Sequence, residues 1–303
     1  AARVGDLLER RGVIASSFFF SLRARLEGKR DELQAGTFTL RRDMPYAAAI
    51  DVLTHNPPPP PTVKLTIPEG RTRHDIAALA ERAGIRGDYL ELSARRTAQL
   101  DPHGYGAPRA RRNLEGFLFP ATYELRRSQA TAANLIAQQL QAFQDNFADV
   151  DLTYARERNL TAYDVLIIAS MIEREAAVPK DRRLISAVIY NRLHDHMPLG
   201  IDATLRYALD DWSRPLTTSQ LRTDSPFNTR LHTGLPPTPI GNPGLASIEA
   251  AAKPARVPYL YYVVKPCGHG AHAFSATAQQ FEHDVAAYEA ARAKAGGKSP
   301  IDC

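Results

Sequence analysis

Apolar residues recur along most of the chain at the three- and four-residue spacing of an amphipathic helix. This spacing predicts helices over residues 128–147, 161–177, 182–194 and 276–293. Shorter stretches at residues 35–42, 62–67 and 259–264 alternate or run apolar and predict strands, and residues 272–275 are expected to pair with the last of them as a hairpin. Helices interspersed with a minority of strands indicate an α+β fold.

Proline and changes of pattern divide the chain into three predicted domains. Residues 1–61 form an N-terminal α/β segment, in which the strand at 35–42 precedes a helix at 44–54 that Asp43 is expected to cap. Residues 62–112 place a strand before a helix that Thr72 and Asp75 open almost as a capping box. Because both segments place a strand before a helix, they predict a weak internal repeat. Residues 113–303 form the third and largest domain.

The proline run at residues 57–61 predicts a stiff polyproline II spacer between the first two domains. A ligand for a proline-reading domain is the functional alternative, and the spacer is the favoured interpretation.

Charge and cysteine content narrow the classes of function. The net charge is +5 and the isoelectric point about 9.2, which favours anionic partners such as nucleic acid, membrane head groups or cell-wall polymers. No nucleic-acid-binding motif is present, so we expect no nucleic-acid partner. Cys267 and Cys303 lack any metal-ligand spacing, so we predict no metal and no cofactor, and leave a single disulfide between them open. No apolar run spans a membrane and the chain opens directly on a helical pattern, so any anchor is expected upstream of residue 1.

The segment IASMIEREA, residues 168–176, places two carboxylates at the edges of a buried helix face. Glu173 and Glu175 each lie about 80° from the centre of the apolar stripe, whereas Arg174 is expected to point to solvent. The stripe consists of Val165, Ile168, Ala169, Ile172 and Ala176. Desolvation at such an edge raises a carboxyl pKa, as a general acid requires. Because residues two apart do not share a helix side, at most one of the two faces a substrate. Taken alone, both are better interpreted as ordinary boundary glutamates.

Several segments, in order along most of the chain, carry a family resemblance. LQAGTFTL (33–40), IPEGRTRHDIA (67–77) and LEGFLFPATYEL (114–125) match successive family elements, the last with Ala121 where Asp is usual. IASMIEREAA, VIYNRLHDHMPLGIDATLRYAL (188–209) and the loop at 225–255 follow, and YLYYVV and AHAFSAT resemble the closing YLYFV and HxFS elements. Together they resemble the YceG-like (MltG) family of endolytic murein transglycosylases.

The resemblance implies a fold, an activity and a location. It implies small LysM-like strand-helix modules, here residues 62–112, ahead of a mixed, mainly helical catalytic domain at residues 113–303. It implies a lyase that cleaves MurNAc–GlcNAc bonds of peptidoglycan glycan strands, leaves 1,6-anhydro-MurNAc ends and so terminates nascent strand elongation. It also implies a protein anchored by an N-terminal transmembrane helix at the extracytoplasmic face of the bacterial inner membrane, where the cell-wall synthesis machinery is its partner.

The same resemblance assigns the catalytic carboxyl group. The second Glu of the family's EKE triplet is the catalytic one and falls on Glu175, while the first falls on Glu173, and both remain candidates. A lytic transglycosylase needs only one carboxyl group, which protonates the leaving oxygen and then helps the sugar's own 6-hydroxyl attack the anomeric carbon.

Seven further residues are candidates for substrate binding, and each has a structural alternative. Asp202 matches the family's SDPT position, but capping of a helix at 203–209 is the favoured interpretation. Asn191 and Arg192, which close the helix at 182–194, could bind glycan, hold Glu175 or cap the helix end. The polar loop around residues 225–229 could donate hydrogen bonds to the sugar or bond to its own backbone. His272 is either a substrate or carboxylate partner or a structural hydrogen bonder. The candidates in the polar loop are Ser225, Asn228 and Thr229.

Two other functions stay open at this stage. A non-catalytic peptidoglycan-binding scaffold would use only the LysM-like part of the chain. A hydrolytic muramidase would produce reducing-end sugars instead of anhydro ends.

Overall fold

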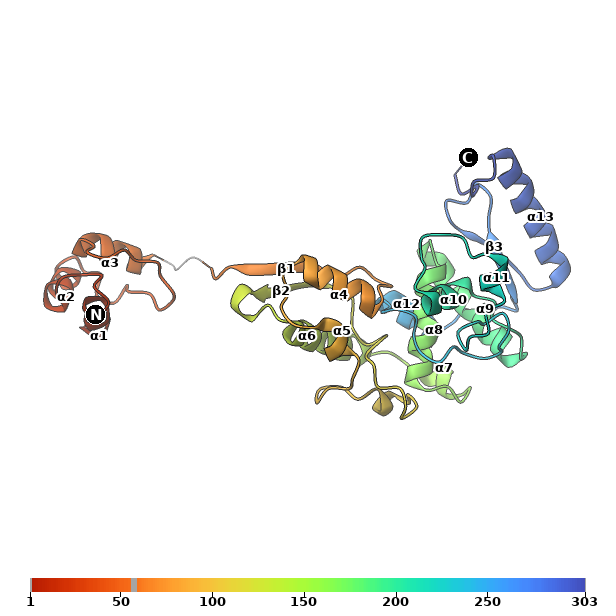
Figure 1. The fold of residues 1–303 in the computed structure, drawn as a ribbon, viewed down its shortest axis with the longest axis horizontal. Helices are drawn as coiled ribbons and strands as arrows, with labels where there is room; N and C mark the ends of the chain where they lie inside the picture. The colour runs from red at the N-terminus through yellow and green to blue at the C-terminus, as the bar shows by residue number, and fades with distance from the viewer. Residues whose placement is uncertain (1, 56–58, 303) are drawn as a thin grey trace. The chain divides into compact units, whose positions relative to one another are not determined.

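The computed structural model describes residues 2–55 and 59–302, and it divides into two compact units, Ala1–Thr62 and Val63–Cys303. The proline spacer predicted at 57–61 lies partly outside the described residues, at Pro57 and Pro58. Both units combine helices with irregular segments, and the second also contains paired strands, so the predicted α+β class is confirmed (Figure 1).

The first unit is a small helical cluster. It contains α1 (Ala2–Arg10), α2 (Ser17–Leu26) and α3 (Tyr46–Thr54). Gly12 closes α1 with a φ of 67°, and the following Val13 donates its backbone N–H to Leu8, which ends the helix as the sequence indicates. Its core consists of Leu8, Val13, Ile14, Phe20, Ala24, Ala49, Ile50 and Leu53.

The strand predicted at residues 35–42 is wrong. The segment is irregular, although Phe38 and Leu40 still pack against the core of the first unit. Its alternation is real, but no strand lies among the described residues of this unit to pair with it. Asp43 does not cap the next helix either, because it adopts a φ of 54° and Pro45 takes the N-cap position. The predicted repeat of a strand before a helix therefore fails in its first copy.

In the second unit, β1 (Thr62–Thr66) pairs with β2 (Thr122–Arg126), and the two strands lie side by side in Figure 1. The connection between them contains α4 (Arg73–Arg82), α5 (Tyr89–Ser93) and a 3-10 turn at Pro102–Tyr105. The capping box of Thr72 and Asp75 forms as predicted, with each side chain accepting the other's backbone N–H. The boundary predicted at 112/113 falls inside this unit, and the LysM-like character of residues 62–112 stays a prediction.

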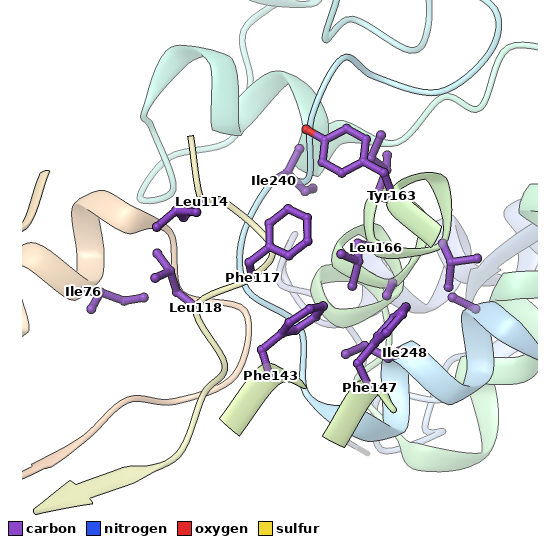
Figure 2. Close-up of a cluster of buried hydrophobic side chains, with 14 of the residues drawn as sticks. Ile76, Leu114, Phe117, Leu118, Phe143, Phe147, Tyr163, Leu166, Ile240 and Ile248 are labelled. Carbon is purple, nitrogen blue, oxygen red and sulfur yellow. The ribbon is translucent and has the colours of Figure 1, made fainter. Parts of the chain in front are cut away.

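The core of the second unit joins its strand-containing part to the helices that follow. Phe117 packs edge-on against Phe143 of α6 (Ala132–Phe147) at 5.1 Å and stacks on Tyr163 of α8 (Ala162–Glu175) at 6.0 Å. Figure 2 shows Phe117 at the centre of this cluster, with Leu118 and Tyr163 on either side. The helix predicted at 128–147 is present as α6, but it begins later, at Ala132, after its N-cap Thr131.

The C-terminal half is built around α8, which is buried on all sides from Val165 to Ile172 rather than along one stripe. It packs against α9 (Arg182–His194), α10 (Asp202–Leu209) and α12 (Leu245–Ala252). The short helix α7 (Thr153–Arg156) precedes α8 in the chain, and α11 (Thr218–Leu221) lies between α10 and α12. The predicted hairpin is confirmed as β3 (Tyr261–Val264) and β4 (His272–Ser275), antiparallel, and α13 (Ala278–Lys294) follows.

Asn242 joins three segments that are far apart in the chain. Its side-chain oxygen accepts the backbone N–H groups of Gly116 and Leu118, each at 2.9 Å. Its amide nitrogen donates to the carbonyl of Arg71 at 2.9 Å and to Glu115 at 2.8 Å. Every hydrogen-bonding group of this buried side chain is therefore used, which holds the 70–73, 115–118 and 241–244 segments together.

Cys267 is disulfide-bonded, and Cys303, the other cysteine considered for a bridge, lies outside the described residues. Within residues 2–55 and 59–302, no helix is long and apolar enough to cross a lipid bilayer.

Candidate active site

Glu175 is the last residue of α8 and faces a pocket of about 450 Å³. The helix ends here because Ala176 turns to an extended conformation, which leaves the carboxylate at the junction of helix and loop. Asp202, the first residue of α10, and Trp212 from the loop after α10 line the same pocket. Its other lining residues are Arg174, Ala203, Arg206, Ser213, Arg214 and Pro215.

The hydroxyl of Tyr262 on β3 donates a hydrogen bond to Glu175 Oε2 at 3.0 Å. Burial raises the pKa of Glu175, and the negative charge of Asp202 raises it further. The Tyr262 hydrogen bond and the positive charge of Arg230 act against this shift and lower the pKa. Glu175 is thus a partly buried carboxyl group that gains protons more readily than an exposed glutamate, as a general acid requires.

Asp202 is paired with a cation rather than capping its helix. Arg230 binds Asp202 Oδ1 through Nη2 at 2.6 Å and through Nε at 2.8 Å. The N-cap of α10 is Ile201, and no side chain caps this helix, so the favoured prediction of a capping role for Asp202 is wrong. The pair places a carboxylate in the pocket of Glu175 together with the positive charge of Arg230, and the two charges act in opposite directions on the pKa of Glu175.

Glu173 has different partners, on another side of α8. One oxygen accepts the backbone N–H of Gly244 at 3.0 Å, directly before α12, and the other lies 3.7 Å from Arg182 Nη2. Its side chain is only 8% exposed and packs close to Gly70. As the helix geometry predicted, Glu173 and Glu175 do not share surroundings, and only Glu175 lines the pocket.

The expectation that Arg174 points to solvent is wrong. Its guanidinium lies 3.7 Å from the centre of the Trp212 ring, and its side chain is 18% exposed. Nη2 lies 3.8 Å from Asp75, and neither Nε nor Nη2 has a hydrogen-bond acceptor among the described residues. The loop that carries Trp212 covers the Arg174 side chain, which the helical wheel could not indicate.

Asn191 and Arg192 connect α9 to the strand that carries Tyr262. Asn191 donates to the carbonyls of Val257 and Tyr259 at 2.9 and 2.8 Å. Arg192 donates to the carbonyls of Leu260 at 2.6 Å and Leu199 at 2.7 Å. These bonds fix the start of β3 against the loop that leads to Asp202.

The polar loop supports the same arrangement from the other side. Asn228 and Thr229 are buried, and their side chains bond to the protein itself: Asn228 to the carbonyls of Leu221 and Thr223, and Thr229 to the backbone N–H of Ile201. The hydroxyl of Ser225 accepts the backbone N–H of Phe227 at 3.3 Å, as in a turn. The loop therefore presents Arg230 to Asp202, and it tethers the start of α10.

His272 on β4 lies behind Tyr262 rather than in the pocket lining. Asp181 Oδ2 accepts the His272 backbone N–H at 2.7 Å and lies 3.0 Å from Nδ1. The imidazole meets the Tyr262 ring edge-on at 5.2 Å. Asp181, His272 and Tyr262 thus form a continuous series of contacts that ends at Glu175.

A second buried carboxyl group lies at the Asn242 junction. Glu115 is 1% exposed, and it accepts hydrogen bonds from the Arg73 backbone, the Tyr207 hydroxyl and Asn242. Burial raises the pKa of Glu115 to about 7. Its hydrogen bonds join the start of α4 and Tyr207 of α10 to the Asn242 junction, and it lines none of the five pockets described.

The largest of the cavities described does not offer comparable chemistry. This cavity, about 930 Å³, lies between α7 and α9 and is lined by Tyr154, Tyr190 and Asn191, with Glu157 as its only carboxylate. Glu157 is exposed and pairs with Arg158 next to it, so nothing there prepares a carboxyl group for proton transfer. In the part of the chain that the structure describes, no three His, Cys, Asp or Glu side chains gather in a way that could hold a metal ion.

Tyr262, Trp212 and Arg230 were not identified from the sequence as parts of the site. The alternation of YLYYVV shows which strand residues share a face, and therefore that Tyr262 points away from Tyr261, but not what that face covers. Trp212 and Arg230 lie in irregular segments without periodicity.

Three comparisons place the chain among known proteins. The model of the YceG-like family matches residues 1–287. A crystal structure of a YceG-like protein from Listeria monocytogenes superposes with a TM-score of 0.60 at 29% identity, covering 92% of this chain and 93% of that one.

Curated relatives carry the name endolytic murein transglycosylase. The protein from Streptococcus pneumoniae serotype 2 (strain D39) is 31% identical over 288 residues, which cover 86% of this chain and 51% of the relative. The protein from Bacillus subtilis is 29% identical over 88% of this chain and 76% of the relative. The chain therefore spans about half the length of the pneumococcal relative and three quarters of the Bacillus one.

Proposed function

Because the chain belongs to the YceG-like family, we propose that it is an endolytic murein lytic transglycosylase in which Glu175 is both acid and base. The observation that carries the proposal is Glu175 itself, a carboxyl group with a raised pKa that lines a pocket and accepts a hydrogen bond from Tyr262. Relatives at about 30% identity bear the matching name, which supports the same activity.

In the proposed reaction, protonated Glu175 donates its proton to the oxygen that leaves the anomeric carbon of MurNAc, and the glycosidic bond breaks. The resulting carboxylate then accepts the proton of the sugar's own 6-hydroxyl as that oxygen bonds to the anomeric carbon. The products are a GlcNAc-ended strand and a 1,6-anhydro-MurNAc end, and no water is consumed. Burial favours the protonated form for the first step, and the Tyr262 hydrogen bond stabilises the carboxylate in the second.

The proposed setting follows from the substrate. Peptidoglycan lies outside the cytoplasm, so we place the protein at the extracytoplasmic face of the inner membrane, anchored by a segment upstream of residue 1. There it would end nascent strands beside the synthesis machinery, and the module at 62–112 would bind glycan as LysM-like modules do.

A hydrolytic muramidase is the second candidate, because Asp202 places another carboxylate in the pocket of Glu175. Two-carboxylate glycosidases use such a group as a nucleophile or to activate water. Asp202 is engaged by Arg230 through Nη2 and Nε, so its oxygen Oδ1 is already occupied, which favours the lytic reaction.

The test is digestion of purified sacculi with the protein and with Glu175→Gln, followed by mass spectrometry of the muropeptides. We expect anhydro-ended products from the unchanged protein and none from Glu175→Gln, with equal far-UV circular dichroism. Glu173→Gln is the matched control: it should lower thermal stability, since the charge that pairs with Arg182 is lost, but retain cleavage. Reducing-end products would establish the muramidase, and binding of sacculi without turnover would establish a scaffold.

A further inference from the structure

The pocket of Glu175 has a cationic wall that the proposed proton transfers do not use. Three arginines line it: Arg174 from α8, Arg206 from α10 and Arg214 from the loop after α10. In the proposed reaction, Glu175 alone transfers the proton to the glycosidic oxygen. The three arginines have no part in that proton transfer.

The charges of this wall are only partly compensated within the protein. Arg206 donates through Nη1 to the carbonyl of Arg214 at 2.6 Å, and neither Arg206 nor Arg214 has an ion-pair partner among the described residues. Asp211, the nearby carboxylate, accepts the backbone N–H and hydroxyl of Ser213, and its charge also interacts with that of Arg214 without forming an ion pair at contact distance. Arg174 is held over Trp212, with Asp75 3.8 Å away.

We propose that this wall binds an anionic substituent of the glycan strand, namely the carboxylates of the stem peptide on the MurNAc residue that is being cleaved. This rests on the proposed function. In peptidoglycan the peptide is attached through the lactyl group at C3 of MurNAc, and the bond cleaved is at C1 of that same ring. A stem peptide attached to the ring that is bound beside Glu175 is therefore expected to lie near the three arginines. A guanidinium group can bind a carboxylate through two parallel hydrogen bonds.

A phosphate at the lipid-linked end of a nascent strand could also bind these arginines, through the same kind of charge-assisted hydrogen bonds. It occurs once in a strand, whereas every MurNAc carries a peptide, and an endolytic enzyme cleaves within the strand. The position of the arginines beside the cleaving carboxyl group therefore favours the peptide.

The experiment measures kcat/KM on three phosphate-free glycan strands of equal length: with stem peptides, with the same peptides amidated at every carboxyl group, and without peptides. We expect the carboxylate-bearing strand to be cleaved about tenfold faster than the amidated one, and this preference to shrink with rising salt. For Arg214→Gln the preference should fall about fivefold. Arg127→Gln, an exposed arginine on another part of the same unit, is the matched control and should leave all values unchanged.

Equal rates on the carboxylate and amidated strands would overturn the inference while leaving the proposed function intact. So would an Arg214→Gln loss that is the same on all three strands, since that would mean a role in positioning sugar. A fourth strand, without peptides but with a terminal pyrophosphate, tests the other anion: preference for it alone overturns the peptide assignment. Binding of the same strands to Glu175→Gln protein, measured by calorimetry, tests the wall even if no strand is cleaved.

Discussion

The contact between Tyr262 and Glu175 makes a directional prediction about the pH dependence of activity. In Tyr262→Phe the ring that packs against His272 and Phe274 stays, and only the hydroxyl that donates to Glu175 at 3.0 Å is lost. Burial keeps the pKa of Tyr262 well above its usual range, so in the unchanged protein this hydroxyl donates at every pH of interest.

The size of the effect follows from the charge on the acceptor. A hydrogen bond to a charged group stabilises it by about 1.5–3 kcal/mol, and one pKa unit corresponds to about 1.4 kcal/mol. The bond favours the carboxylate, so its loss raises the pKa of Glu175, by about one to two units. Since the first step needs the protonated acid, activity falls as pH rises through this pKa, and the alkaline limb of the profile should move upward by the same amount.

The assay is the pH profile of kcat/KM for glycan cleavage from about pH 4 to pH 9, which reports the pKa of the free enzyme. Tyr261→Phe is the matched control, because the neighbouring side chain points to the opposite face of β3 and stacks on Phe281 at 5.1 Å. Its profile should coincide with that of the unchanged protein. An unshifted or downward-shifted limb in Tyr262→Phe, with thermal stability preserved, would refute the reasoning.

Two further substitutions test the electrostatics of the buried carboxyl groups. Asp202→Asn removes a negative charge that raises the pKa of Glu175 and frees Arg230, so the alkaline limb should move downward, and an upward shift in the same assay would contradict the charge argument. Glu115 has a pKa raised from 4.5 to about 7, so the folded protein holds a proton that the unfolded chain releases. The free energy of unfolding should therefore fall by about 3 kcal/mol as pH rises from 4.5 to about 7. In Glu115→Gln urea unfolding should show a flatter dependence, and a curve parallel to that of the unchanged protein would exclude Glu115 as its source.

Local periodicity was enough to predict the helix that carries the candidate acid and the separation of its two glutamates. Both depend on geometry within one helix: i and i+2 differ by about 200° in direction, whatever surrounds the helix. The hairpin at the C-terminus and the capping box of Thr72 were equally local, and both are confirmed.

The errors concern what lies beyond an element rather than the element itself. Residues 35–42 alternate like a strand, but a strand also needs a neighbour to bond, and none of the described segments of the first unit provides one. Arg174 was expected to reach solvent and instead meets Trp212, which lies in a loop whose path no pattern indicates. Tyr262 is 87 positions from Glu175, and only the packing of β3 against the end of α8 brings them together.

The strongest motifs of the chain do not all mark chemistry. Three of the segments that resemble the family meet at Asn242 and Glu115, namely those at 67–77, 114–125 and 241–244. There they form hydrogen bonds with one another. Gly116 illustrates the constraint: its φ is 90°, and a Cβ there would come within 2.6 Å of Pro239. Such residues are restricted because the fold requires them at a close approach, whereas Glu175 needs only a half-buried position and a donor. A candidate catalytic residue in this chain is therefore better identified by a carboxyl group that lines a pocket and has a raised pKa than by the density of motifs around it.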